Sequence, residues 1–329
     1  MSSFGPGVLE LDTRAEISRI AGRLREQVTR LLRRRGAVVA LSGGIDSSVV
    51  GALAVRALGP EHVLGLLLPE RDSAAETPGL GQTLTEHLGI ASIQEDITPL
   101  LEATGCYRRR DDALREVVPA YGPGWKFKIV LPQVGEDASY NFFSAVVQSP
   151  DGAMQKVRLP PRAYLGIVAA TNFKQRVRKM LEYYHADRLQ YAVAGTPNRL
   201  EYDQGFFVKL GDGAADVKPI AHLYKTQVYA LARALGLPEE ICARPPTTDT
   251  YSLSQGQDEF YFSLPYAQLD LCLYAHNHAV AAADVAPHVG LRVDQVERVY
   301  ADITKKRATT RYLHSVPQLI EAVPEISRV

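Results

Sequence analysis

Cysteine and tryptophan are scarce in this sequence, and its charges cancel. Its 329 residues include 3 cysteines and 1 tryptophan, and 37 basic residues balance 37 acidic ones. The cysteines are widely spaced, at Cys106, Cys242 and Cys272. This spacing matches neither a disulfide framework nor a metal-binding knuckle. Zero net charge argues against a broad nucleic-acid surface, because such binding depends on neutralising many phosphates. We therefore expect a reduced, cytoplasmic protein that binds no nucleic acid.

Long apolar runs are missing as well. No segment reaches the roughly 20 apolar residues that span a membrane, and no secretory signal is present. The sequence also has no internal repeat, low-complexity tract or clear linker. These absences predict a soluble protein without membrane contact, built as one domain over residues 1–329. We expect an insertion at about 107–161 and a C-terminal helical and tail segment at about 265–329.

The most informative stretch present is Ala37–Ser48. Five apolar residues, 37–41, predict a short buried strand, and Gly43-Gly44 predicts a tight turn. A helix then opens near Ser47 and stops at Gly59. A strand, a glycine turn and a helix start together aim backbone N–H groups and a helix dipole at an anion. With the hydroxyls of Ser42, Ser47 and Ser48, the expected ligand is phosphate or pyrophosphate.

Asp46 separates this loop from the common phosphate-binding P-loop. That motif needs Lys followed by Ser or Thr after its second glycine, and the sequence has neither feature here. A carboxylate beside a phosphate is repulsive unless a cation lies between them. Asp46 therefore predicts Mg²⁺ that bridges to ATP. The alternative is a helix start capped by Ser and Asp, which needs no ligand.

Strands and helices alternate along most of the chain. This order predicts the α/β class, with a parallel sheet and helices on both faces. Ligands of such sheets bind at the carboxyl ends of strands, where residues 42–48 fall. Further strands are expected at Val63–Leu68, Ala91–Ile97 and Leu189–Ala194. Helices are expected at Thr13–Arg35 (with a Thr13–Glu16 capping box), Thr83–Leu88, Pro99–Cys106, Leu165–His185, Tyr224–Leu235, Tyr266–His278 and Val293–Ile303.

Residues 107–161 interrupt this alternation. Strand patterns at Lys126–Leu131, Tyr140–Gln148 and Met154–Leu159 predict a β-rich insertion. The charged run Tyr107–Asp112 is predicted to be a solvated surface turn. A lid, a dimer contact and a peripheral hairpin all stay open as roles for the insertion.

A second strand-end loop carries chemistry after residue 194. Thr196 is placed to hydrogen-bond a nucleotide, and Glu201 to ligate a metal. The glycine-rich segment 205–213 follows, with further charged residues up to Lys225. Scattered charges of this kind are usually solvated ion pairs, but their place in glycine-rich loops after a strand favours a site.

Several motifs together resemble the NAD⁺ synthetases, which belong to the pyrophosphatase-loop ATP-dependent ligases. They are Ser42–Ser48, Asn172–Arg176, Gly195-Thr196 with Glu201, Gly205–Asp216, Pro219, Leu223–Lys225 and Pro246-Thr247. The resemblance covers about residues 15–105 and 165–310. It implies an adenine-nucleotide α-hydrolase-like, Rossmann-like sheet and a homodimer.

The implied reaction has two steps. The carboxylate of deamido-NAD⁺ attacks the α-phosphorus of ATP, giving an adenylylated intermediate and pyrophosphate, and ammonia then displaces AMP. The resemblance implies that Asp46 and Lys225 are catalytic and that Asp46 and Glu201 bind Mg²⁺. It implies ATP contacts at Ser42, Gly43, Gly44, Asp46, Ser47, Ser48, Thr196, Lys225 and Thr247. It implies deamido-NAD⁺ contacts at Arg176, Lys209, Asp216, Lys305 and Lys306, where Lys305 replaces the family's His.

The nitrogen source and two rival functions complete the expectations. Only some 35 residues precede the first strand, so we expect free ammonia or a separate glutaminase to supply nitrogen. The insertion and Lys305 favour, as the first rival, a related ligase that adenylylates another carboxylate. The second rival is a non-catalytic nucleotide-binding module, which Asp46 together with Glu201 opposes. Residues 283–296 loosely resemble a DNA-binding helix-turn-helix, but Pro287 favours a plain helical hairpin.

Overall fold

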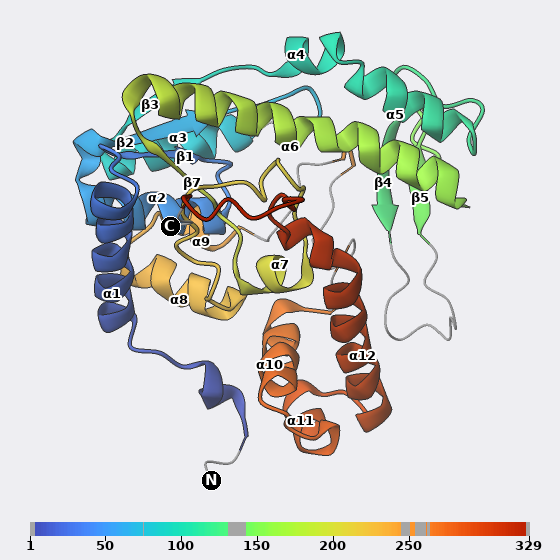
Figure 1. Ribbon diagram of the computed structural model, residues 1–329. Coiled ribbons are helices and arrows are strands. Elements are labelled where there is room, and N and C mark those ends of the chain that lie inside the picture. The colour runs from blue at the N-terminus through green and yellow to red at the C-terminus, as the bar shows by residue number, and fades with distance from the viewer. Residues whose placement is uncertain are drawn as a thin grey trace.

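A four-stranded parallel sheet lies at the centre of the fold, as seen in a computed structural model of the chain (Figure 1). The structure describes residues 4–74, 76–130, 143–244, 251–253, 261 and 264–326. The strands are β1 (Ala37–Ala40), β2 (Val63–Leu67), β3 (Ala91–Gln94) and β7 (Ala192–Ala194), in the order β3-β2-β1-β7. Val38 pairs with both Leu64 and Val193, so β1 is a central strand. The predicted α/β class is confirmed.

Helices cover both faces of this sheet because β1 and β2 are apolar on both sides. Val39 belongs to the core shared with α1 (Thr13–Glu26), α2 (Ile45–Leu58), α3 (Thr77–Leu88) and α8 (Lys225–Ala234). Its neighbour Val38 belongs to the opposite core, shared with α4 (Thr98–Ala103), α5 (Cys106–Arg115) and α6 (Pro161–Leu189). Successive side chains of a strand point to opposite faces, so β1 contributes to the cores on both faces of the sheet.

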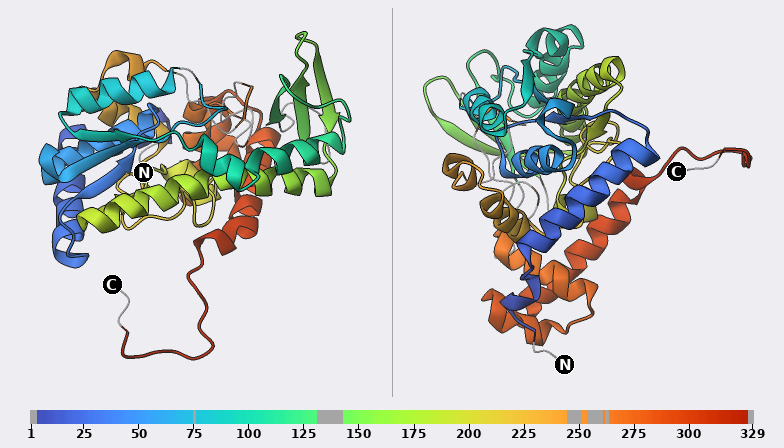
Figure 2. Two further views of the ribbon diagram at one scale, coloured as in Figure 1. Left: turned by 90° about the horizontal axis from the view of Figure 1, so that it is seen from above. Right: turned by 90° about the vertical axis from the view of Figure 1, so that its left-hand side faces the viewer.

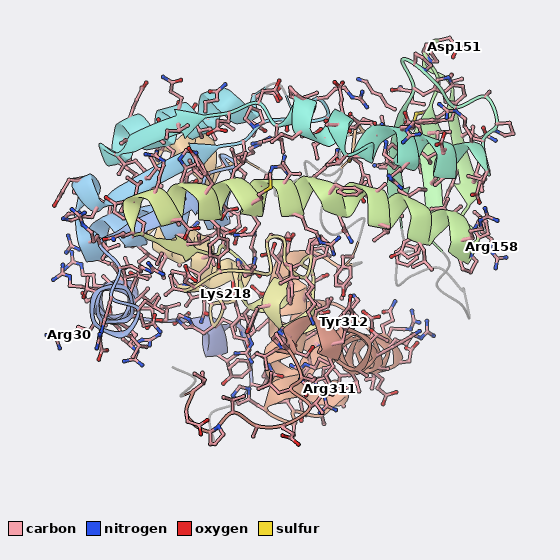
Figure 3. The ribbon with its side chains drawn as sticks, turned by 45° about the horizontal axis from the view of Figure 1, so that its top comes forward. Arg30, Asp151, Arg158, Lys218, Arg311 and Tyr312 are labelled. Carbon is pink, nitrogen blue, oxygen red and sulfur yellow. The ribbon has the colours of Figure 1, made fainter. Side chains whose placement is uncertain are left out.

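A second, antiparallel sheet is attached to the far end of α6. It consists of β4 (Lys126–Val130), β5 (Ser144–Gln148) and β6 (Met154–Arg158), which confirms the predicted β-rich insertion. Phe127 and Ile129 pack with Leu114 of α5 and with Ile167 of α6. Asp151 and Arg158 mark the outer part of this sheet, well away from β1 (Figure 3).

The prediction of a surface turn at Tyr107–Asp112 is wrong. These residues belong to α5, and Tyr107 and Arg110 are buried. The run was misread because charge was equated with exposure. Arg110 is paired with Asp72 and Asp111, and such pairing is what permits a buried guanidinium.

Some predicted boundaries also need correction. Asp12, rather than Thr13, caps α1 by accepting hydrogen bonds from the backbone N–H groups of Arg14 and Ala15, each at 3.0 Å. A short π-helix, Gln27–Leu31, follows α1, and Arg33 has a φ of 53°, so the helix ends before Arg35. Helix α3 begins earlier than predicted, at Thr77, and α6 begins at Pro161.

The C-terminal helices form a separate apolar cluster. They are α10 (Tyr266–Asn277), α11 (Ala282–Val289) and α12 (Val293–Thr310), with Leu273, Val285 and Val299 at the contact. Residues 283–296 thus form the expected helical hairpin. After the short turn η5 (Arg311–His314) the chain leaves the helices (Figure 2). None of the helices described here is long and apolar enough to cross a membrane.

Candidate active site

A cavity of about 650 Å³ lies at the carboxyl ends of β1, β2 and β7, against α6. Both strand-end loops identified in the sequence contribute to it. The predicted residues that line it are Ser42, Gly44, Asp46, Ser47, Thr196, Glu201, Lys225, Arg176 and Lys209. This volume falls within the range of small-molecule sites.

Gly43 makes the first loop possible. It has a φ of 70°, and a Cβ added there would lie 2.7 Å from Cβ of Leu80. The turn lets the carbonyl of Gly44 accept hydrogen bonds from the hydroxyls of Ser47, at 3.0 Å, and Ser48, at 2.8 Å. Ser48 is fully buried. The two serines therefore brace the start of α2, and Ser42, Gly44 and Ser47 are the loop residues at the cavity wall.

A cluster of charged and amide groups connects the two loops. Lys225 Nζ forms an ion pair with Asp46 Oδ2, and Asn198 Nδ2 donates to Asp46 Oδ1 at 3.1 Å. The backbone N–H of Asn198 donates to Glu201 Oε2 at 3.1 Å, and that of Glu201 to Asn198 Oδ1 at 3.2 Å. This capping box starts α7 (Arg199–Gln204) and fixes Glu201 next to the cavity. Sequence reasoning missed Asn198, although an Asn just before a strand-end helix is a recognisable cap.

Burial sets the charge state of this cluster. Burial and the neighbouring Asp46 carboxylate raise the pKa of Glu201 to about 8. For Lys225, burial lowers the pKa, but the carboxylates of Asp46 and Glu201 outweigh it, and the net shift is upward. Near neutral pH the site thus holds a charged Lys225 ammonium paired with Asp46, beside a Glu201 carboxyl group that largely keeps its proton.

The two carboxyl groups suit Mg²⁺, which is commonly held by one or two carboxylates together with substrate phosphates. Within the described residues no group of three or more His, Cys, Asp or Glu side chains is placed to hold a metal. A site made by protein groups alone is therefore not seen in that part of the chain. Asp46 and Glu201 fit a cation that arrives with a nucleotide.

The predicted acceptor residues divide into two groups. Arg176 and Lys209 line the cavity, and Arg176 Nε donates to the carbonyl of Lys209 at 3.3 Å. Lys209 Nζ donates to the carbonyl of Tyr312, at 2.8 Å, and to Ser315 Oγ, at 2.9 Å. The C-terminal turn is thereby tied to the cavity, which Tyr312 also lines.

The other predicted acceptor residues are engaged elsewhere. Asp216 accepts a hydrogen bond from the backbone N–H of Val193, at 2.8 Å, at the edge of β7. Lys306 Nζ donates to the carbonyl of Tyr261 at 2.6 Å and pairs with Asp302. Lys305 is exposed. Thr247, a predicted ATP contact, lies outside the described residues.

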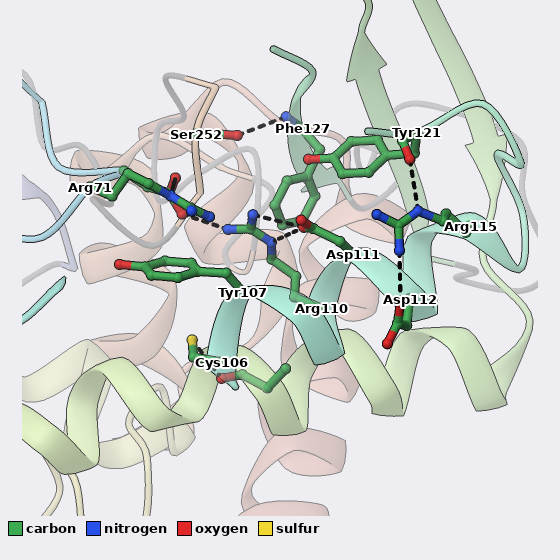
Figure 4. A network of polar contacts seen from close by, with 12 residues as sticks. Arg71, Cys106, Tyr107, Arg110, Asp111, Asp112, Arg115, Tyr121, Phe127 and Ser252 are labelled. Carbon is green, nitrogen blue, oxygen red and sulfur yellow. Dashed lines mark hydrogen bonds and ion pairs between the residues drawn. The ribbon is translucent and has the colours of Figure 1, made fainter. Parts of the chain in front are cut away.

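A buried polar network holds the loop after β2 against α6. Lys174 Nζ contacts Glu70 Oε1 and Asp72 Oδ2, each at 2.8 Å. The hydroxyl of Tyr107 donates to Glu70 at 2.7 Å, and Arg110 pairs with Asp72. Figure 4 shows the second ion pair of Arg110, with Asp111. Neighbouring residues of both segments line the cavity, so this network fixes one of its walls.

The parallel sheet, with its loops meeting at the carboxyl edge, defines an α/β protein of the kind that binds its ligand at that edge. The family model for NAD synthase matches residues 16–117 and 145–312, and the chain belongs to this family.

Relatives match almost the whole chain. An NH(3)-dependent NAD(+) synthetase from Rhizobium meliloti is 60% identical, covering 98% of this chain and 96% of its own. A protein of the same name from Mesorhizobium japonicum is 59% identical, covering 97% and 100%.

Solved structures share the fold. An NMN synthetase from Francisella tularensis has a TM-score of 0.65 at 21% identity, covering 94% of this chain and 99% of its own. An NH3-dependent NAD synthetase from Campylobacter jejuni has a TM-score of 0.61 at 20% identity, covering 94% and 100%.

Proposed function

We propose that this protein is an ammonia-dependent NAD⁺ synthetase, which uses ATP to convert deamido-NAD⁺ to NAD⁺ with release of AMP and pyrophosphate. The observation that carries the proposal is the Asp46–Lys225 ion pair beside the Ser42–Ser47 loop, in the same cavity as Arg176. Membership of the NAD synthase family, with relatives at 60% identity, supports the same reaction.

The first step needs charge neutralisation at the ATP phosphates. The Gly44 and Ser47 end of α2 receives the phosphates, and the Lys225 ammonium faces the pyrophosphate as it departs. Asp46 and Glu201 would hold Mg²⁺, which when bound supplies further positive charge for the leaving group. The acceptor carboxylate then attacks the α-phosphorus, and the bond from that phosphorus to pyrophosphate breaks.

The second step needs an acceptor that stays in place. Arg176 and Lys209 bind the anionic groups of deamido-NAD⁺ at the rim of the cavity. Ammonia attacks the adenylylated carboxyl carbon, the amide forms, AMP leaves, and a proton goes to solvent. Lys305, Lys306 and Asp216 are proposed to join the acceptor site when substrate is bound, as the family resemblance implies. Free ammonia or a separate glutaminase supplies the nitrogen.

A homodimer is part of this proposal. Leu165, Met180 and Tyr184 are 55–62% exposed, and their helical spacing puts them within one stripe along α6. An exposed apolar stripe on a well-packed helix is typical of an interface. A cytoplasmic location also belongs to the proposal. It is supported by the cysteines, because Cys106, Cys242 and Cys272 form no disulfide.

One assay tests the reaction. Purified protein is incubated with ATP, Mg²⁺, deamido-NAD⁺ and either ammonium or glutamine, and NAD⁺ and AMP are quantified. We expect equal amounts of both products with ammonium and neither with glutamine alone. Turnover of another carboxylate without NAD⁺ formation would instead establish the rival amide-forming ligase, which the outlying positions of Lys305 and Asp216 favour. An Asp46→Ala variant as active as the wild type would contradict the role assigned to Asp46.

A further inference from the structure

The end of the cavity farthest from the central sheet is aromatic. Phe143, Tyr164 and Tyr251 all line it. The rings of Phe143 and Tyr164 are stacked, with centroids 4.1 Å apart and an interplanar angle of 13°. Tyr251 is 4% exposed and packs edge-on against Phe127 of the small sheet, with centroids 5.1 Å apart. We call Phe143, Tyr164 and Tyr251 the aromatic wall. Its rings are held in place by stacking on one another and by packing against the small sheet.

The insertion supplies part of this wall. Phe143 immediately precedes β5 and lies in the segment 118–144, between the two stretches that the NAD synthase family model matches. The relative at 60% identity nevertheless covers 98% of this chain. The wall thus combines a part of the chain outside the family model with Tyr164 of α6. An entirely peripheral hairpin would not reach the cavity.

The wall is far from the phosphate loop. The small sheet and β1 lie at opposite ends of α6 (Figure 1). Cavity-lining residues of α6 run from Tyr164 to Glu182, a length of roughly 27 Å at the helical rise. Arg176 lies roughly 18 Å from Tyr164 on the same scale. This length suits an extended dinucleotide, with its phosphates at the basic residues and a base at the aromatic end.

We propose that Phe143 and Tyr164 form a stacking platform for the adenine ring of the acceptor dinucleotide, because the pyridine ring has to lie near ATP at the phosphate loop. This inference rests on the proposed function and names how the acceptor is selected. The bound ring adds one layer to the existing stack, and Tyr251 and Val168 close the sides. Every base has a π-face, so stacking recognises the ring without needing a hydrogen-bond pattern. The insertion is thereby a specificity element of the acceptor site.

The test separates the aromatic ring from the apolar character of the side chain. Phe143→Leu keeps an apolar side chain, Phe143→Tyr keeps the ring, and Tyr164→Leu removes the other layer. Met154→Ala, on the exposed outer strand β6 at a residue that is 57% exposed, is the matched control. For each protein, KM for deamido-NAD⁺ and KM for ATP are measured separately, together with equilibrium binding of deamido-NAD⁺ and of nicotinate mononucleotide.

We expect both Leu variants to raise KM and Kd for deamido-NAD⁺ about tenfold, the usual scale of one base–aromatic stack. KM for ATP should change less than twofold, and Phe143→Tyr and Met154→Ala should match the wild type. Nicotinate mononucleotide lacks the adenine, and its carboxylate has to reach ATP at the phosphate loop, so its Kd should not change in the Leu variants. A parallel loss for nicotinate mononucleotide would overturn the platform.

Failure of the platform and failure of the proposed function give different results. Leu variants with wild-type Kd for deamido-NAD⁺, or with an effect on ATP alone, overturn the platform while leaving NAD⁺ formation intact. A wild-type protein that forms no NAD⁺ overturns the proposed function itself, together with the inference that rests on it.

Discussion

Lys225 is the residue on which the chemistry depends most. Its side chain is 1% exposed and is paired with Asp46, so its charge is held within the cavity. We predict that Lys225→Ala lowers kcat about 10²- to 10³-fold, the usual loss when one preorganised charge at a leaving group is removed. KM for deamido-NAD⁺ should change little. Steady-state release of pyrophosphate measures both constants.

Lys225→Arg is the informative companion variant, because it keeps the charge and changes its shape. It should retain more activity than Lys225→Ala. A normal kcat in Lys225→Ala would show that the Lys225 ammonium takes no part in the reaction.

Asp270 is the residue whose titration affects stability. It accepts hydrogen bonds from the backbone N–H groups of Lys225, at 3.3 Å, and Thr226, at 2.8 Å. Burial raises its pKa from 3.8 to about 6, despite these hydrogen bonds. Between about pH 4 and 6 the unfolded chain releases this proton while the folded protein keeps it. The contribution of Asp270 to the free energy of unfolding therefore falls as pH rises through that window, by about 3 kcal/mol, and is level above it.

Asp270→Asn removes this titration. We predict that urea unfolding at several pH values gives a wild-type curve that falls relative to the variant's between pH 4 and 6. Two curves that run parallel over that range would contradict the raised pKa of Asp270.

Single residues were predicted from the sequence where a local motif contained them. Asp46 and Glu201 follow strands in recognisable loops. The pairing of Asp46 with Lys225 was not predictable, because the two residues are 179 positions apart and only the fold brings them together. Asn198 was missed because its role depends on a tertiary contact as well as on its cap.

At the scale of elements, the buried network anchors α6 to the loop after β2. The Lys174 side chain is 1% exposed, and that of Glu70 is fully buried. We predict that Lys174→Met lowers the free energy of unfolding by about 3 to 5 kcal/mol, since it leaves the buried Glu70 carboxylate without its cation. Tyr107→Phe removes one hydrogen bond to Glu70 and should cost about 2 kcal/mol. Urea unfolding at constant pH compares them, and equal losses would contradict this ranking.

The glycine turn before α2 gives a second prediction. Gly43→Ala places a Cβ 2.7 Å from Leu80 at a φ of 70°, and should destabilise the fold by about 1 to 2 kcal/mol while raising KM for ATP. Gly79→Ala is the matched control, because nothing lies within 4 Å of its Cβ in α3 and alanine favours a helix. Thermal unfolding and ATP kinetics measure the two effects. Similar behaviour of the two variants would contradict a special role for the turn.

Elements were predictable where polarity followed burial. The apolar strands β1 and β2 and the long helix α6 were anticipated within a few residues. The segment Tyr107–Asp112 was not, because the partner that neutralises Arg110 comes in part from Asp72, 38 positions away. A charged helix that is buried by such pairing looks like a surface segment in sequence.

At the scale of the whole molecule, the exposed stripe on α6 predicts the oligomeric state. We expect light scattering to give about 72 kDa, twice the chain mass of 36.1 kDa. Met180→Glu combined with Tyr184→Glu should shift the protein to monomer, because charges are then buried at the interface. Leu100→Glu, at a residue 39% exposed on α4, is the control. A wild-type monomer at micromolar concentration would exclude the dimer.

The overall class and the central sheet were predictable, because alternating strands and helices leave few ways to form a sheet. The place of the insertion was not. Its strands were anticipated, but whether it lay beside the cavity depended on α6, which carries it roughly 27 Å along the cavity from Glu182.

Helix α6 also sets an angular constraint on the site. It joins the aromatic wall at Tyr164 to Arg176 through uninterrupted helix. One residue inserted between them would move Tyr164 by only about 1.5 Å but rotate it by about 100°, out of the cavity. A whole turn could be added with little rotation, which would lengthen the site while keeping both groups facing inward. We therefore expect the length of the acceptor site in this fold to change by insertions or deletions of three or four residues within α6.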